Sequence, residues 1–285
     1  MDLTLPNKNK TSLEVVNSVY ESVLKYYPFL TKKELKEFKT KAITTLQDKT
    51  EIENKPIRVA TTLISLLNNS LADIKLYHQQ QSKNLPQKLF SHQVIKDALY
   101  IKIPHWVSDP NISNQLIDLV SNSLSKINSI VIDVRDNDGG NSNYAHQFAS
   151  IFFNTDMIFG KIVSKNFQGQ LSKKPYKIHP HLSIYVDKPL CIIINGRCFS
   201  SNELFIAPFK VLHRALLVGT KTRGGSANPI RFILKSLDNY YRVRIPTWRF
   251  FLGNNTRPIE ETGIEPDLYY DKDDIINFSI ASLTN

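Results

Sequence analysis

Cysteine is scarce in this chain of 285 residues, which contains only Cys191 and Cys198. Two cysteines cannot build the disulfide framework of a small secreted domain, and their spacing matches no zinc-binding cluster. Glycine and proline are also few, at 10 and 14 residues, which argues against a fibrous or disordered chain. We therefore expect a globular protein that uses no metal and no other cofactor.

Long apolar runs and basic tracts are missing as well. No stretch reaches the length of a membrane span, and Met1 to Lys8 lack the pattern of a signal peptide. The chain as given is expected to be soluble and cytoplasmic, or exported if a signal peptide has been removed. The net charge is +10, but no lysine- or arginine-rich tract and no RNA-binding motif accompany it. We expect no nucleic-acid partner and no membrane span, and a surface charge that could steer acidic peptides. The oligomeric state stays open.

The first part of the chain, residues 1–80, is predicted to form a helical bundle. One helix has apolar residues at helical spacing: Leu13, Val16, Val19, Val23 and Tyr27. Thr31 and Glu34 form a capping-box pattern that begins a second helix. A third helix follows Pro56, with apolar positions that continue to Leu71.

The rest of the chain, residues 81–285, is predicted to form an α/β domain. A polar linker at residues 79–84 marks the boundary. From residue 98 onwards strand-like and helix-like segments alternate, which indicates a layered α/β architecture. Ile230–Leu234 and Tyr241–Ile245 are predicted to pair as a hairpin.

One segment has the pattern of a strand, a tight turn and a helix. The apolar run Cys191–Ile194 ends at Asn195-Gly196, Ser200 and Ser201 follow, and Glu203 begins an apolar helix. Such a turn exposes a serine hydroxyl beside a helix N-terminus, whose free N–H groups suit a developing oxyanion. The same residues also fit a plain serine N-cap with Glu203 as its capping-box partner.

A second segment, residues 129–141, has a buried strand that enters a glycine-containing loop. Its polar positions read D-x-R-x-N-x-G-G, from Asp133 to Gly140. Paired glycines allow the backbone to approach a ligand closely and to present its N–H groups. Asp133 and Arg135 are expected to brace this loop.

Two further motifs complete a pattern. Residues 219–225 read GTKTRGG and residues 260–267 read EETGIEPD. The four motifs, in this order, resemble the serine peptidase family of the carboxy-terminal processing proteases and the tricorn core, which also includes the interphotoreceptor retinoid-binding proteins. The resemblance extends from the helical front to Asp267 and is strongest to the tricorn-like branch. It implies a crotonase-like, layered ββα domain after a small helical bundle, without space for a PDZ domain.

The resemblance also implies roles for individual residues. Ser200 lies three residues before Glu203, as the family's nucleophile does, and Ser201 is the competing hydroxyl. The backbone N–H groups of Gly140, or Gly139, and of Ser201 would form the oxyanion hole. Glu260, with Glu261 as the alternative, matches the tricorn-like glutamate.

The general base is the position at which the chain departs from the family. The family's front bundle ends in L-x-D-G-H, whereas this chain reads Leu71-Ala72-Asp73-Ile74-Lys75, so Lys75 replaces the histidine. His78 follows one helical turn later, and Gly225 stands where the processing proteases have their lysine. The base is therefore Lys75, His78 or absent, and the other histidines are expected to be structural.

The sequence thus predicts a serine hydrolase, and within that class a peptidase that acts on a peptide or protein through Ser200. The alternative is an inactive pseudo-peptidase that binds a peptide or an apolar ligand on the same scaffold. The intact serine turn, the glycine pair and the Glu260 motif favour the enzyme. Lys75 in place of histidine favours the binding protein.

Overall fold

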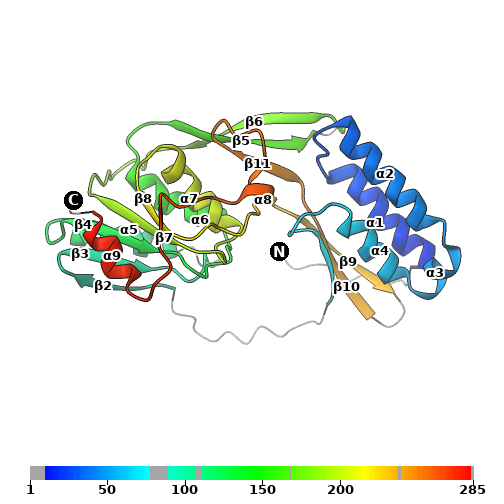
Figure 1. Cartoon of the computed structure of the whole chain (residues 1–285), viewed down its shortest axis with the longest axis horizontal. Coiled ribbons are helices and arrows are strands. Elements are labelled where there is room, and N and C mark those ends of the chain that lie inside the picture. Colours follow the sequence, from blue (N-terminus) through cyan, green and yellow to red (C-terminus); the bar gives the residue numbers. More distant parts are fainter. Residues whose placement is uncertain are drawn as a thin grey trace. The chain divides into compact units, whose positions relative to one another are not determined.

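A computed structural model describes residues 10–77, 89–106, 109, 111–166, 168–236 and 239–283 (Figure 1). The chain divides into two compact units. The helical unit comprises Met1–Asn84, Ile162–Lys174 and Ala227–Arg249. The sheet unit comprises Leu85–Lys161, Pro175–Ser226 and Phe250–Asn285.

The sheet unit is built on a six-stranded mixed sheet with the order β12-β8-β7-β4-β3-β2. The strands, in this order, are Leu268–Tyr269, Leu216–Gly219, Leu190–Ile194, Ser129–Asp133, Ala98–Lys102 and Ser91–Ile95. The neighbours from β12 to β3 are parallel, and only β2 pairs with β3 in an antiparallel direction. This confirms the predicted α/β class.

The central strands β4 and β7 are buried along their whole length. Their continuous apolar runs fit parallel strands that are covered on both faces, because such strands have no solvent side to alternate with. Helix α9, Ile275–Ala281, packs on one face through Ile275 and Ile280. Because β4 and β7 are parallel neighbours, the loops that follow them leave the sheet at the same edge.

Four further helices belong to the sheet unit: α5 (Asn111–Ser123), α6 (Ser142–Ala149), α7 (Ser201–Val211) and the short α8 (Ile259–Thr262). A 3₁₀ turn, Ser150–Phe152, follows α6. Helices α6 and α7 contact each other through aromatic rings, with Phe148 stacked on Phe205 at 6.1 Å between ring centroids. Trp106 is fully buried beside them, so it belongs to the core rather than to an open cleft.

The helical unit contains helices α1 (Ser12–Tyr26), α2 (Lys32–Leu46), α3 (Lys49–Asn54) and α4 (Pro56–Ser65). Thr11 and Glu14 form a complete capping box at the start of α1. At α2 the predicted capping box is only half formed. Thr31 accepts the Glu34 N–H, but the Glu34 carboxylate binds the N–H of Leu30 and the guanidinium of Arg249.

The prediction that the third helix continues to Leu71 is wrong. Helix α4 ends at Ser65, and Asn68 adopts a left-handed backbone with φ of 44°. Asn tolerates that conformation better than most residues, and it breaks the helix. The chain then forms strand β1, Asp73–Leu76, which pairs with β10.

The sheet of the helical unit has the order β1-β10-β9, where β10 is Asn239–Ile245 and β9 is Ile230–Ser236. The predicted hairpin strands therefore pair as expected, but they join the helical unit. The reason is burial: Leu234, Val243 and Ile245 lie in one apolar cluster with residues of α1 and α4.

A third sheet has the order β11-β5-β6, with strands Trp248–Leu252, Met157–Lys165 and Leu171–Ile178. Each of these strands begins in one unit and ends in the other. Among the described residues, no helix combines the length and the apolar character that a membrane crossing requires.

Candidate active site

Ser200 lies at the end of the loop that follows β7, immediately before α7 begins at Ser201. Its φ of 59° and ψ of −125° are unusual for a residue with a side chain. Such backbone strain persists only where the surroundings enforce it, and it occurs often at functional turns. Ser200 is half-buried.

The glycine pair of the loop after β4 lies directly against this turn. A Cβ added to Gly139 would come 2.8 Å from the Ser200 Cβ and 3.0 Å from the Ser201 nitrogen. At Gly140 a Cβ would come 1.8 Å from the Trp106 carbonyl oxygen. Both glycines also have positive φ, 107° and 133°. Close approach and backbone conformation therefore both require glycine here.

Hydrogen bonds tie the two loops together. The Phe199 N–H donates to the Asn137 carbonyl at 3.1 Å. The buried Asn202 amide donates to the carbonyls of Val134 and Asn137, at 3.1 and 3.2 Å. The Ser201 hydroxyl donates to the Gly140 carbonyl at 2.7 Å. Ser201 Oγ is thus engaged in holding the loops.

Two backbone N–H groups, of Gly140 and Ser201, donate no hydrogen bond within the part of the chain that the structure describes. Ser201 is the first residue of α7, where the N–H groups have no partner inside the helix. Partly positive donors of this kind can stabilise a negatively charged oxygen.

Glu203 is fully buried beneath the Ser200 turn. Burial, reinforced by the charge of the nearby Glu260, raises the pKa of its carboxyl to about 8, although hydrogen bonds from Thr222, Gly224 and Ser200 act to lower it. The N–H groups of Gly224 and Ser200 donate to it at 2.9 and 3.2 Å. The sequence marked Glu203 only as a cap and gave no sign of its burial.

Glu260 lies on α8 and is half-buried. One carboxylate oxygen accepts the Phe250 N–H at 3.4 Å. Helix α8 rests on the 222–224 loop: a Cβ on Gly224 would come 2.6 Å from the Ile259 carbonyl oxygen. The charge of Glu260 reaches Glu203, so Glu260 lies in the region of the Ser200 turn. Glu261 pairs instead with Arg257 at 3.3 Å.

Lys75 lies on β1 of the helical unit, and 64% of its side chain is exposed. Its ammonium lies 3.5 Å from the Asp73 carboxylate, which also binds Arg244. His78 lies outside the described residues. At Gly225 an added Cβ would come 2.3 Å from the Phe199 ring, so a lysine side chain there would displace that ring.

His105 is a candidate that the sequence analysis treated as structural. Its Nδ1 lies 2.7 Å from the Asp138 carboxylate. Its neighbour Trp106 pairs with Gly140, and the Trp106 N–H donates to the Gly139 carbonyl at 2.9 Å. The backbone of His105 therefore runs beside the glycine pair. The signal in the sequence was Asp138 immediately before the two glycines.

The remaining motif residues are structural. Asp133 is fully buried and accepts hydrogen bonds from Tyr100, Lys102 and Arg135. Burial acts against ionisation of Asp133, but its basic partners lower its pKa overall. Both cysteines are buried and free. No group of three or more His, Cys, Asp or Glu side chains in the described ranges could hold a metal ion.

Comparisons with known proteins bear on the family and the fold. The sequence model of peptidase family S41 matches residues 97–270. The tricorn protease of Thermoplasma volcanium is 27% identical over 143 residues, which is 50% of this chain and 12% of that protein. The chain spans 8 to 12% of the length of the curated relatives it matches.

Two solved structures share the fold over nearly the whole chain. A candidate peptidase from Parabacteroides merdae has a TM-score of 0.73 at 15% identity, covering 97% of this chain and 98% of that one. A lipoprotein from Streptococcus agalactiae has a TM-score of 0.70 at 17% identity, covering 99% of both chains. At these identities the likeness establishes the fold.

Proposed function

Since the chain belongs to peptidase family S41, we propose that it is a serine peptidase that cleaves peptides or proteins by acyl transfer through Ser200. The Ser200 oxygen would attack the scissile carbonyl carbon while its proton passes to a base. The N–H groups of Gly140 and Ser201 would bind the resulting oxyanion. The amine then leaves with a proton, and water hydrolyses the acyl-serine ester.

The observation that carries this proposal is the contact between the two loops. Gly139 lies against Ser200, and the N–H groups of Gly140 and Ser201 have no partner among the described residues. Loss of one oxyanion donor typically lowers the rate of an enzyme by about two to three orders of magnitude. Two fixed donors beside the strained Ser200 backbone therefore favour acyl transfer as the reaction. The parallel strands β8, β7, β4 and β3 also suit a crotonase-like domain.

Two glutamates support the turn in this proposal. Glu203 holds the Ser200 N–H and links it to the loop of Thr222 and Gly224. It acts on the backbone of the turn, so we class it as a positioning residue. Glu260 is the family's glutamate by motif, and in the proposal its carboxylate orients the base or a substrate-bound water.

We assign the proton acceptor to His105, in preference to Lys75. The Asp138 carboxylate, 2.7 Å from Nδ1, could orient the His105 ring, and the backbone of His105 runs beside the glycine pair. Lys75 has the family position, but 64% of its side chain is exposed and its ammonium is paired with Asp73.

A fluorophosphonate probe tests the proposal, because it labels only an activated serine. We expect labelling of the wild type, loss in Ser200→Ala, and retention in Ser201→Ala. His105→Ala should abolish labelling, whereas Lys75→Ala should retain it. Labelling that survives Ser200→Ala would refute the assigned nucleophile, and labelling that depends on Lys75 alone would move the base to the family position.

The exposure and the ion pair of Lys75 favour a second candidate function, that of an inactive pseudo-peptidase. Where the family has its histidine, this chain has an exposed lysine that is paired with a carboxylate. A pseudo-peptidase would bind peptides through the same loops without cleaving them. Its signature is an unlabelled wild type that becomes labelled in Lys75→His.

A further inference from the structure

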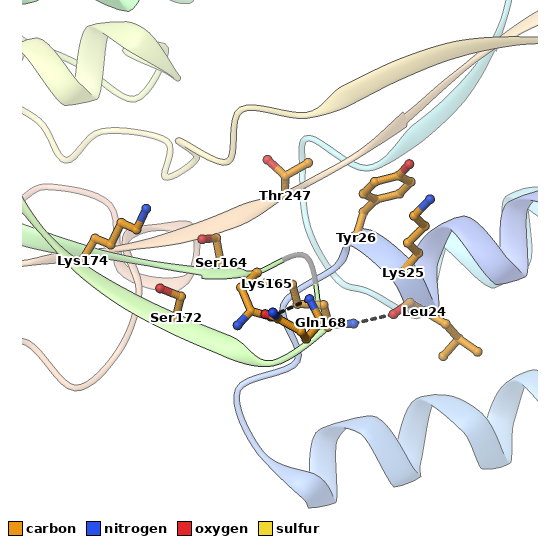
Figure 2. Close-up of a pocket in the computed structure, with 11 residues that line it drawn as sticks. Leu24, Lys25, Tyr26, Ser164, Lys165, Gln168, Ser172, Lys174 and Thr247 are labelled. Carbon is orange, nitrogen blue, oxygen red and sulfur yellow. Dashed lines mark hydrogen bonds between the residues drawn. The ribbon is translucent and has the colours of Figure 1, made fainter.

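The helical unit contains a cavity of about 630 Å³ that is separate from the residues discussed above (Figure 2). Helix α1 lines one side and the β5–β6 hairpin lines the other. We call it the cationic cavity. Its lining residues are Leu24, Lys25, Tyr26, Ser164, Lys165, Asn166, Gln168, Gly169, Ser172, Lys174 and Thr247.

The lining is positively charged and rich in hydrogen-bond donors. It contains Lys25, Lys165 and Lys174, and the described lining residues include no acidic side chain. Figure 2 shows Lys25 and Tyr26 on the α1 side and Lys174, Ser164 and Ser172 on the hairpin side. The few polar groups of a ligand pocket determine which ligand it orients, and here they are cations and hydroxyls, which suit a charged, oxygen-rich ligand.

Lys165 is the innermost of these cations. It is half-buried, and its ammonium donates to the Leu24 carbonyl near the C-terminal end of α1. Burial lowers its pKa, and the positive charge of Lys39 lowers it further. Its described contacts, the Leu24 carbonyl and the Phe29 ring at 5.6 Å, carry no full negative charge. An anion beside Lys165 would therefore offset an electrostatic cost that the fold leaves in place.

An adjoining cavity of about 430 Å³ shares Leu24, Lys165 and Gly169 with the cationic cavity. It adds two cations, Lys32 and Lys39. Its apolar lining includes Phe29, Leu30, Leu35 and Leu171.

The carboxylate nearest in sequence to this second lining, Glu34, is already engaged. Arg249 lies 2.6 Å from one of its oxygens, and the Leu30 N–H donates to the other at 2.6 Å. Glu34 therefore does not neutralise Lys32, Lys39 or Lys165, and their positive charge is available to a ligand. Together the two cavities present cations next to aliphatic side chains.

We propose that the two cavities bind an acidic segment of a polypeptide, with carboxylates at the lysines and apolar side chains at the leucines. That this polypeptide is a substrate rests on the proposed function; the binding itself does not. A peptide fits better than a nucleic acid, because apolar side chains such as Leu35 and Leu171 lie beside the lysines and match the apolar side chains of a peptide.

The test measures binding to the full chain carrying Ser200→Ala, so that no cleavage interferes. The probe is a short fluorescent peptide that alternates glutamate and leucine, followed by fluorescence anisotropy at physiological ionic strength. We expect Lys174→Glu and Lys25→Glu each to weaken binding by about tenfold, since each replaces an attractive charge by a repulsive one. The glutamine–leucine counterpart should bind at least about tenfold more weakly.

Lys173→Glu is the matched control. Lys173 is the exposed neighbour of Lys174 on β6, it lines neither cavity, and its substitution changes the net charge equally. It should change the affinity by less than about twofold, because neighbouring residues of a strand point to opposite faces and Lys173 does not line the cavity. Circular dichroism checks that each variant is folded.

Three results would overturn the inference. They are equal weakening by Lys173→Glu and Lys174→Glu, absence of peptide binding, and tighter, Lys174-dependent binding of a fluorescent single-stranded RNA. None of these depends on fluorophosphonate labelling. Failure of the cationic cavity and failure of the proposed peptidase are therefore distinguishable.

Discussion

The Ser200 turn and the strand that carries Lys75 are built in opposite ways. Around Ser200, buried groups such as Asn202 and Glu203 fix the backbone, and glycines allow the loops to touch. Around Lys75, the side chain faces solvent and its partner Asp73 is shared with Arg244. Buried, fixed geometry therefore surrounds Ser200, whereas the Lys75 side chain is exposed on its strand.

The largest effect is expected from Gly140→Ala. The new Cβ would come 1.8 Å from the Trp106 carbonyl oxygen, at a φ of 133° that alanine avoids. Displacing backbone and straining φ together should lower the free energy of unfolding by about 4 kcal/mol or more. Chemical denaturation measures this, and fluorophosphonate labelling should be lost as well.

Gly196→Ala is the control for that substitution. Gly196 lies on the same turn as Ser200, but its nearest contact for a Cβ is the Lys221 carbonyl oxygen at 3.6 Å, an ordinary distance. It should change stability by less than about 0.5 kcal/mol. Equal effects of the two alanines would show that the glycine pair does not lie against the Trp106 backbone.

The second prediction concerns the buried carboxyl of Glu203, whose pKa is raised to about 8 from an ordinary value of 4.5. Between these values the folded protein holds a proton that the unfolded chain has released. Stability is therefore highest below pH 4.5 for this group and falls as pH rises towards 8, by up to about 1.4 kcal/mol per pH unit. Glu203→Gln cannot ionise and should flatten this slope.

Thermal unfolding measured between about pH 5 and 8 checks the slope. The variant should also lose a roughly constant 1–2 kcal/mol, because its amide cannot accept the Ser200 N–H at the same time as the Gly224 N–H. The exposed Glu261→Gln should leave the slope unchanged. A wild-type slope that persists in Glu203→Gln would contradict the burial of this carboxyl.

Asp73 in the helical unit should show the opposite pH dependence. Burial acts to raise its pKa, but the hydrogen bonds and charge of Arg244 outweigh burial and lower it below 3.8. Its contribution is present above pH 3.8 and is lost as pH falls through the lowered value. Asp73→Asn should cost about 1–2 kcal/mol at neutral pH and nothing in strong acid.

Denaturation at neutral and acid pH measures that loss, with Glu37→Gln on α2 as an exposed control. A constant cost at all pH values would indicate a packing role for Asp73 instead of a charge pair with Arg244. The Asp73 contribution to the free energy of unfolding should rise with pH and the Glu203 contribution should fall. This result would confirm that the fold favours the charged form of Asp73 and the neutral form of Glu203.

The sequence predicted the strands around Ser200 better than the strand that carries Lys75, because of the range of the interactions involved. The apolar runs of β4 and β7, the glycine pair and the serine turn are local signals, and the strands around them formed as expected. Strand β1 was missed because Leu71 continues the helical spacing, whereas Asp73 becomes a strand residue only by pairing with Arg244. That partner lies far away in the sequence.

Two other features depended on tertiary packing in the same way. The hairpin β9–β10 joins the helical unit because its apolar face meets α1, which no local pattern reveals. The pair of His105 and Asp138 forms only because the chain after β3 pairs with the glycine loop after β4. Isolated histidines and aspartates carry no periodic signal, so sequence reasoning treated His105 as structural.

The smallest effect is expected from Lys75→Ala. This variant is the sharpest test of the contrast between the Ser200 turn and the strand that carries Lys75. Most of the Lys75 side chain is exposed, and its contact with Asp73 is a surface ion pair. Such pairs contribute about 0.5 kcal/mol or less, so chemical denaturation should detect almost no change. Fluorophosphonate labelling should stay within about twofold of the wild type, because the Lys75 ammonium is directed to Asp73 and solvent. Arg244→Ala is the informative control: it should destabilise the protein by about 1–3 kcal/mol, since it leaves the half-buried Asp73 carboxylate with Lys75 as its remaining described partner. A labelling rate that falls by orders of magnitude in Lys75→Ala, with stability intact, would show that this exposed lysine is the working base after all.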